Sequence, residues 1–377
     1  MTRATINRLE CLDGLRGVLA VYVMISHLAP FAALPAWVQH VLSHGGAAVD
    51  MFFILSGLVI LRSLESLDFA ARPFLIGRIT RIFPVFLAMF AVGVAVQPLP
   101  ANFDALPWIA PDSLARGIWS DGWPRSWGFD IAAHLTMTHG LFPNGLASDV
   151  WLSFLGAAWS LSSEWQFYVL VLLLGRMGLD APRLAAFFLS LAVVGLVWDS
   201  TVPEAWRFSR AFLPNKADYF ALGIASAIWL RGESVRPLIV VLLATLLLCA
   251  ARGQAGKLLP PVLWVVCLLA QQSYGPLKPV SACLRWPVAR SLGAISYPIY
   301  LANEPLQKIL GYGLTLLVPG DPFYFTLFWL PAATLIPIAA AAALHRYIEL
   351  PGLRWGRARM SDVRRSGENE QVAIIRS

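Results

Sequence analysis

Long apolar runs, separated by short polar segments, recur along the whole 377-residue chain. A run of about 20 apolar residues is long enough to cross a bilayer as an α-helix. The pattern therefore predicts an all-α, polytopic membrane protein, a bundle of about ten transmembrane helices. The predicted helices cover residues 13–34, 46–64, 78–97, 151–175, 183–199, 211–231, 235–251, 258–273, 291–311 and 323–346.

The polar segments divide the chain into one integral domain and two short ends. Residues 1–11 form the N-terminal segment, and residues 12–350 form the transmembrane domain. Within that domain, residues 98–150 make a long connection rich in Pro, Trp and Asp, which ends in a predicted re-entrant or interfacial helix. Residues 351–377 form a polar, basic tail that we expect to be disordered.

The composition agrees with a membrane protein and excludes most soluble folds. Hydrophobic residues make up 58% of the chain and charged residues only 14%, whereas a soluble domain carries about 25% charged residues. The net charge of +7 does not indicate nucleic acid, because the basic residues gather at the predicted helix ends. They are more frequent on the side that holds both termini, which the positive-inside rule places in the cytoplasm.

Arg16 and His27 are ionisable residues inside the first apolar run. Arg16 and His27 are eleven residues apart, so they share one helix face and lie about 16 Å apart along its axis. Ionisable groups inside a membrane are costly and mark functional sites by default. We therefore expect a path along this face on which a ligand moves or reacts.

Further polar residues fall at a depth similar to that of His27 when residues are counted from the cytoplasmic ends of the predicted helices. These residues are Asp50, Glu164, Asn303 and Glu304. A histidine with several carboxylates near the middle of a membrane is typical of an acid–base site. The sequence thus predicts one polar cluster formed by four helices.

Each member of this cluster also has a simpler structural interpretation. Asp50 follows GGAAV and is placed to cap a helix, and Glu304 precedes Pro305, where a kink frees carbonyl groups. Ser160 and Glu164 are four residues apart and can hydrogen-bond a neighbouring helix. The coincidence of all of them at one depth favours the functional interpretation.

Arg78 and Arg81 begin the third predicted helix, in GRITRIFPVF. Their spacing of three residues places them on one helix face. Arginines at helix ends commonly extend toward the membrane surface. With Arg16 on the same side, however, they predict an anion site for a phosphorylated cytoplasmic ligand.

The long connection offers chemistry on the other side of the membrane. His134 and His139 are five residues apart, a spacing that suits joint metal binding poorly, so we predict no metal site and expect a surface role in acceptor binding. Aromatic rings in the connection suit either sugar stacking or a membrane-interface belt. These rings belong to Trp119, Trp123, Trp127 and Trp151.

Five ordered motifs carry a family resemblance. They read LDGLRGVLAVYVMISH, GGAAVDMFFILSGLVI, RITRIFPVF, WSLSSEWQFYVL and LGAISYPIYLANEP. In this order they resemble the membrane-bound acyltransferase 3 family, over residues 12 to about 350. The resemblance implies a bundle of about ten helices in a bacterial inner membrane, without the SGNH domain that some members carry. It also implies transfer of an acyl group, often acetyl, from cytoplasmic acyl-CoA to a glycan or glycolipid across the membrane, with no tightly bound cofactor.

The family motifs fall on residues already singled out. The Arg-x10-His pattern matches Arg16 and His27, the Arg-x-x-Arg pattern matches Arg78 and Arg81, and the Trp-Ser-Leu-x-x-Glu pattern matches Trp159, Ser160, Leu161 and Glu164. One position departs from the family. Many members have a histidine where this chain has Asn303, so a second histidine is not essential here, or Glu304 takes its role.

These expectations combine into a mechanism. Arg16, Arg78 and Arg81 bind the phosphates of acyl-CoA (acetyl-CoA by default), and its thioester reaches His27. His27 acts as general base or as nucleophile, with its tautomer fixed by one of two carboxylates. Those carboxylates are Asp50 and Glu164.

The rival prediction is a proton-coupled transporter that uses the same histidine and carboxylates as a proton relay. It leaves the three cytoplasmic arginines unexplained. It also predicts inverted repeats, which the sequence does not show.

Overall fold

The computed structural model describes residues 9–119, 122–253 and 255–360. Within this part of the chain the structure is helical, without strands. The helices are α1 (Glu10–Leu28), α2 (Ala36–Leu42), α3 (Gly45–Ser66), α4 (Ala71–Val96), α5 (Ala115–Ile118), α6 (Trp127–Leu135), α7 (Asn144–Ala147), α8 (Trp159–Arg176), α9 (Ala181–Thr201), α10 (Ala217–Leu230), α11 (Arg236–Ala251), α12 (Leu259–Gln271), α13 (Lys278–Arg285), α14 (Pro287–Ala294), α15 (Ser296–Leu317) and α16 (Pro322–Leu344). The all-α prediction is confirmed.

Every predicted helix overlaps one in the structure, but the count of ten membrane spans is not confirmed. In chain order the predictions correspond to α1, α3, α4, α8, α9, α10, α11, α12, α15 and α16. By length and composition, five helical segments of the described chain are able to cross a membrane, or six if one bent pair forms a single span. The five are Glu10–Phe31, Ala36–Ser66, Ala71–Val96, Ala181–Thr201 and Pro322–Met360.

The remaining predicted spans fall short for physical reasons. α10, α11 and α12 contain 14, 16 and 13 residues, whereas a span needs about 20. The α12 segment joins α13 at a bend of 100°. α8 and α15 are long enough, but polar residues interrupt their apolar sequence, and those residues line the site described below.

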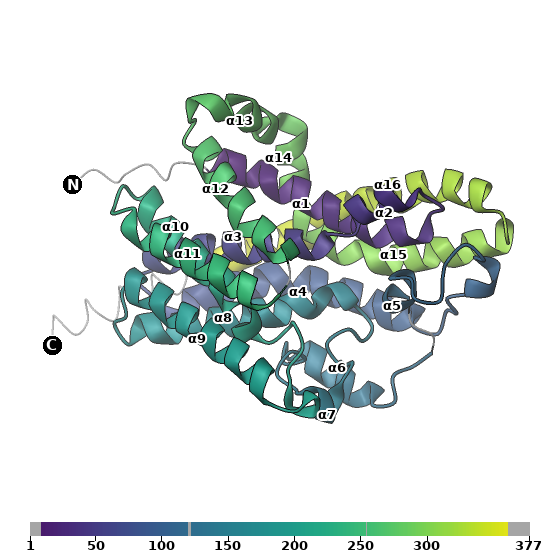
Figure 1. The fold of residues 1–377 in the computed structure, drawn as a ribbon, viewed down its shortest axis with the longest axis horizontal. Helices are drawn as coiled ribbons and strands as arrows, with labels where there is room; N and C mark the ends of the chain where they lie inside the picture. The colour runs from purple at the N-terminus through teal and green to yellow at the C-terminus, as the bar shows by residue number, and fades with distance from the viewer. Residues whose placement is uncertain (1–8, 120–121, 254, 361–377) are drawn as a thin grey trace.

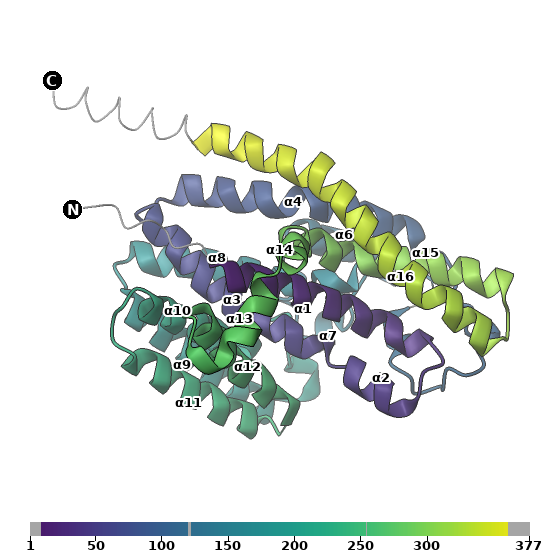
Figure 2. The same cartoon turned by 90° about the horizontal axis from the view of Figure 1, so that it is seen from above.

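The helices form an elongated bundle (Figure 1). α1 packs against α3, α14 and α15, while α3 packs against α10 and α15 packs against α16. α1 begins and the last helix ends at the same end of the bundle, which we call the terminal end (Figure 2). The long connection with α5, α6 and α7 follows the opposite end and one flank (Figure 1), which we call the connection end.

Close contact between α3 and α10 requires glycine on both helices. A Cβ atom at Gly223 would collide with the carbonyl oxygen of Ile54, and one at Gly57 would collide with that of Phe220. Small residues allow backbones to approach in this way, which strengthens van der Waals packing between helices. This pair fixes one wall of the site.

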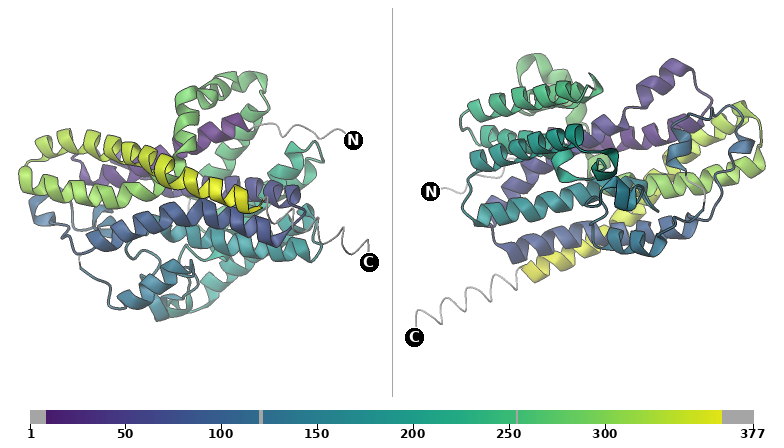
Figure 3. Two further views of the ribbon diagram at one scale, coloured as in Figure 1. Left: turned by 180° about the vertical axis from the view of Figure 1, so that it is seen from behind. Right: turned by 60° about the horizontal axis from the view of Figure 1, so that its bottom comes forward.

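The C-terminal boundary differs from its prediction. The last helix passes through a π-helical turn at His345–Glu349 and continues to Met360, so the expected disordered tail is wrong for residues 351–360. Figure 3 shows this extension lying along α4, where Gly352 approaches Pro84. Residues 1–8 and 361–377 lie outside the described residues.

Candidate functional site

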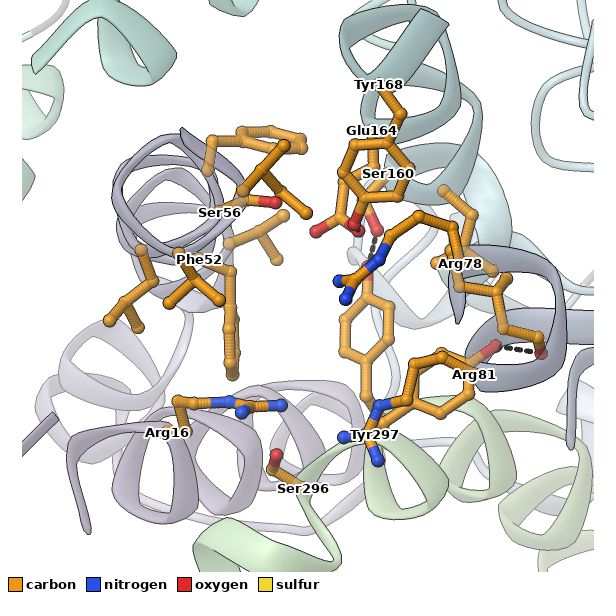
Figure 4. Close-up of a pocket in the computed structure, with 18 of the residues that line it drawn as sticks. Arg16, Phe52, Ser56, Arg78, Arg81, Ser160, Glu164, Tyr168, Ser296 and Tyr297 are labelled. Atoms are coloured by element: carbon orange, nitrogen blue, oxygen red, sulfur yellow. Dashed lines mark hydrogen bonds between the residues drawn. The ribbon is translucent and has the colours of Figure 1, made fainter. Parts of the chain in front are cut away.

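A cavity of about 420 Å³ opens between α1, α3, α4, α8 and α15. We call it the arginine cavity. Its polar wall includes Arg16, Arg78, Arg81, Ser160, Glu164 and Tyr300, while α3 contributes a wall that is apolar except for Ser56. Figure 4 shows Arg16 from α1, Arg78 and Arg81 from α4, and Glu164 from α8 reaching into this space. The structure thus brings together the three arginines that the sequence predicted as one anion site.

Positive charge in the arginine cavity is only partly compensated. Arg81 forms an ion pair with the buried Glu349. Among the described residues, neither Arg16 nor Arg78 has an ion-pair partner. The lining holds three arginines and one glutamate, so its formal charge is 3 − 1 = +2. Uncompensated guanidinium groups in a cavity are suited to binding a phosphate or another anion.

Glu164 belongs to this cavity and does not orient His27. Its carboxylate accepts a hydrogen bond of 2.5 Å from the hydroxyl of Tyr168, one turn further along α8. At the other end of the polar wall, the hydroxyls of Ser160 and Tyr300 are 2.9 Å apart. The negative charge of Glu164 therefore partly offsets the positive charge of the arginines, and Ser160 connects α8 to Tyr300 of α15.

His27 is oriented by Asn303. Its Nδ1 lies 2.8 Å from Oδ1 of Asn303. The amide nitrogen of Asn303 donates to the carbonyl oxygens of Ile299 and Tyr300 at 3.1 and 2.6 Å, which leaves Oδ1 as the acceptor. His27 Nδ1 then carries the proton and Nε2 keeps its lone pair, the form required of a base or nucleophile.

The arginine cavity comes close to His27 without including it. Tyr300 lines the cavity and lies one helical turn before Asn303 on α15. His27 itself is half-buried and faces α15 through its bond to Asn303. A long ligand anchored at the arginines would therefore end beside the His27–Asn303 pair.

Asp50 has a different role from the predicted one. It is fully buried and binds Lys216 Nζ at 2.5 Å and Lys257 Nζ at 3.2 Å. Two ammonium groups occupy this carboxylate, so it does not fix the tautomer of His27. The sequence pattern did not predict this pairing. Its only signal was Lys216, a lysine inside the apolar predicted helix 211–231.

Glu304 is held by backbone groups. Its two carboxylate oxygens accept hydrogen bonds from the N–H groups of Gly156 and Ala157, at 3.3 and 2.9 Å. The predicted cluster of polar groups is therefore not joined into one by hydrogen bonds among the described residues. The structure separates it into His27 with Asn303, Asp50 with its lysines, Glu164 in the arginine cavity, and Glu304 at the turn before α8.

His134 and His139 are buried, which corrects their predicted place on the surface. Their rings stack with centroids 4.1 Å apart, and His139 bonds the carbonyl oxygen of Ala158 at 3.1 Å. Burial lowers the pKa of His139 to about 4 and that of His134 well below its usual value. The pair is thus neutral and supports the turn that binds Glu304. The described residues contain no group of three or more His, Cys, Asp or Glu able to hold a metal.

Trp159 contributes an aromatic face rather than a polar group. The guanidinium carbon of Arg210 lies 5.5 Å from the centre of its ring and 4.9 Å from that of Trp151. Arg210 is itself exposed. Sequence reasoning missed Arg210 and Glu349, because each meets its neighbours through contacts between distant parts of the chain.

Comparison with known proteins identifies the family of the chain. The family model described as Acyltransferase domain, that of the acyltransferase 3 family, matches residues 9–346. The chain is 26% identical to acyltransferase MdmB of Streptomyces mycarofaciens in an alignment 394 positions long. This alignment covers 92% of this chain and 92% of that protein. It is 27% identical to the exopolysaccharide production protein ExoZ of Rhizobium meliloti (strain 1021) over 337 residues, which cover 85% of this chain and 93% of that protein. No solved structure matches the chain significantly. Because the family model covers nearly the whole chain, the protein belongs to the acyltransferase 3 family of membrane-embedded acyltransferases.

Proposed function

We propose that this acyltransferase moves an acyl group, acetyl by default, from acyl-CoA to a hydroxyl group of a carbohydrate acceptor. One observation carries the choice of donor: the arginine cavity has a formal charge of +2, and two of its arginines have no ion-pair partner among the described residues. Among common acyl donors, acyl-CoA combines several phosphate groups with a long, thin pantetheine arm.

The shape of the site supports this donor. Phosphate groups bind at Arg16, Arg78 and Arg81 through charge-assisted hydrogen bonds. The arm of CoA is long and thin, and it follows the apolar wall of α3 toward Tyr300. Arg16 and His27 are about 16 Å apart along α1, at about 1.5 Å per residue. This separation suits a thioester delivered to the His27–Asn303 pair while the phosphates stay at the arginines.

The chemistry then uses the free lone pair on Nε2 of His27. As general base, Nε2 takes the proton of the acceptor hydroxyl while its oxygen attacks the thioester carbonyl. The C–S bond breaks and the proton passes to the departing thiolate, which leaves as CoA. In a two-step route, Nε2 first accepts the acyl group itself and then passes it to the hydroxyl.

The similarity to an exopolysaccharide production protein favours a glycan as acceptor. A glycan presents many hydroxyl groups and no thioester, so it fits the accepting half of the reaction. The family match supports acyl transfer over the proton-coupled transport that the sequence left as its rival.

The test separates donor binding from transfer. CoA or acetyl-CoA should raise the unfolding temperature of the detergent-purified protein. Arg78→Gln should weaken CoA binding by about 10- to 100-fold, the effect of losing a charge-assisted hydrogen bond worth about 1.5–3 kcal/mol. Arg72→Gln is the matched control, since Arg72 is an exposed residue of α4 outside the cavity.

His27→Ala should keep the stabilisation by CoA and lose acyl transfer to a de-acylated glycan. Equal CoA affinity in the Arg78 variant and the wild type would remove the arginine cavity from the donor role. Normal transfer by the His27 variant would remove His27 from the chemistry.

A further inference from the structure

A second cavity, of about 620 Å³, lies toward the connection end of the bundle. We call it the connection cavity. It is bounded by the end of α4, by residues of the long connection and by α15, and its polar lining includes Gln97, Trp123, Arg125, Asp149, Glu304 and Lys308. Its volume is within the range of about 300–1,000 Å³ that is typical of small-ligand sites. The chemistry described above leaves it unused.

The charge of this lining differs from that of the arginine cavity. Its described residues include three carboxylates, from Asp130, Asp149 and Glu304, and two cations, from Arg125 and Lys308. The formal charge is 2 − 3 = −1, against +2 in the arginine cavity. A phosphorylated ligand is disfavoured here, whereas a neutral ligand with many hydroxyl groups meets both donors and acceptors.

Aromatic residues complete this lining. Trp123 is 47% exposed and offers an aromatic surface for a sugar face. Trp119 also lines the cavity and is only 2% exposed, and its indole N–H has no hydrogen-bond partner among the described residues. A buried N–H without a partner is costly, and a ligand hydroxyl in the cavity would satisfy it.

The two cavities share a partition. Gly156 lines the connection cavity, and Ser160, four residues later, lines the arginine cavity. Glu304 holds this turn through two backbone N–H groups and follows directly after Asn303, which orients His27. A ligand in the connection cavity therefore borders the same turn and the same stretch of α15 as the place where the proposed thioester ends.

From this arrangement we propose that the connection cavity binds the acceptor, and that the acceptor is a neutral, hydroxyl-rich carbohydrate. The inference rests on the proposed acyl transfer and adds the place and the charge class of the accepting substrate. The bulk of the acceptor occupies this cavity while one hydroxyl group reaches His27.

The experiment fills the cavity at a position where a larger residue is tolerated. A Cβ atom at Gly117 meets nothing within 4 Å, and Gly117 lines the cavity. Gly128 has equally open surroundings and does not line it. Gly117→Trp should raise the KM for the acceptor at least tenfold with unchanged stabilisation by CoA, and Gly128→Trp should behave as the wild type.

The acceptor probe is surface glycan of the producing organism, de-acylated with alkali, cut to oligosaccharides and separated by anion exchange into neutral and acidic fractions. Radiolabelled acetyl-CoA should label the neutral fraction. Label confined to the acidic fraction would overturn the charge class, and a normal acceptor KM in Gly117→Trp would overturn the site. No transfer by the wild type to either fraction would instead contradict the proposed function.

A second variant tests the same site in case Gly117→Trp does not fold. Trp123→Ala removes the exposed ring and should also raise the acceptor KM, with kcat changed less than threefold. Trp37→Ala is its control, because Trp37 is 72% exposed on α2 and outside the cavity. Equal acceptor KM values in these two variants would contradict the stacking of a sugar on Trp123.

Discussion

At the scale of single residues, Asn303 decides which nitrogen of His27 is available for chemistry. Replacing it by leucine in Asn303→Leu removes the acceptor for Nδ1–H, so the ring loses its preferred tautomer and orientation. We expect kcat for acyl transfer to fall about 10- to 100-fold, the effect of losing an interaction worth about 1.5–3 kcal/mol. The KM for acyl-CoA should stay within twofold.

Gln307→Leu is the matched control for this prediction. Gln307 is also buried on α15, but it bonds the carbonyl oxygens of Met24 and Ala333 rather than His27. Its loss should lower the unfolding temperature and leave kcat within twofold of the wild type. A wild-type kcat and pH profile in Asn303→Leu would show that the His27 tautomer does not depend on this bond.

Single residues also show how far the sequence could predict the site. Helix periodicity and motif spacing predicted that Arg16, Arg78 and Arg81 would form one anion site, because all three lie near helix ends on the same side. The partner of Asp50 could not be predicted. Lys216 is 166 residues away, and only the packing of α3 against α10 brings the two together.

At the scale of helices, the α3–α10 contact should limit the stability of the fold. In Gly223→Val the added side chain meets the carbonyl oxygen of Ile54, a backbone atom that moves only if α3 moves. Such overpacking costs typically about 1–3 kcal/mol. We expect a lower unfolding temperature in detergent, measured by loss of folded protein on heating, and no change in that temperature for Gly313→Val, where a Cβ meets nothing within 4 Å. An unchanged midpoint in Gly223→Val would mean that the two helices adjust without loss.

Helix positions were predictable from apolar runs, but two boundaries were not. Residues 151–158 are apolar and were assigned to a span, yet α8 begins only at Trp159, after Phe154 with a φ of 62° and a short 3₁₀ turn. That turn binds Glu304, so a contact with α15 determines where α8 starts. The bend after α12 follows Ser273, which has a φ of 58°. Local hydropathy carries no information on either backbone conformation.

At the scale of the whole molecule, the two ends of the bundle differ in their basic residues, and this difference predicts how the bundle is oriented in the membrane. The terminal end holds the turns after α3, α8 and α10, and arginines at the adjoining helix ends flank these turns. The arginines are Arg62, Arg72, Arg176, Arg183, Arg231 and Arg236. Three basic residues toward the connection end are already engaged in ion pairs, Lys216 and Lys257 with Asp50, and Arg252 with Asp218. The positive-inside rule therefore predicts that the terminal end faces the cytoplasm.

Thiol labelling tests this orientation. Cys283 is the exposed cysteine among the four in the chain, so Cys283→Ser gives a silent background. In that background we expect Ser200→Cys, at the connection end of α9, to react with a membrane-impermeant maleimide in intact cells. Ser66→Cys, at the last residue of α3, should react only once the membrane is permeabilised. Both serines are exposed in the structure. Labelling of Ser66→Cys in intact cells would mean that the arginine cavity faces away from the cytoplasm, where acyl-CoA is made. That result would rule out acyl-CoA as the donor, even though the charge of the cavity matches it.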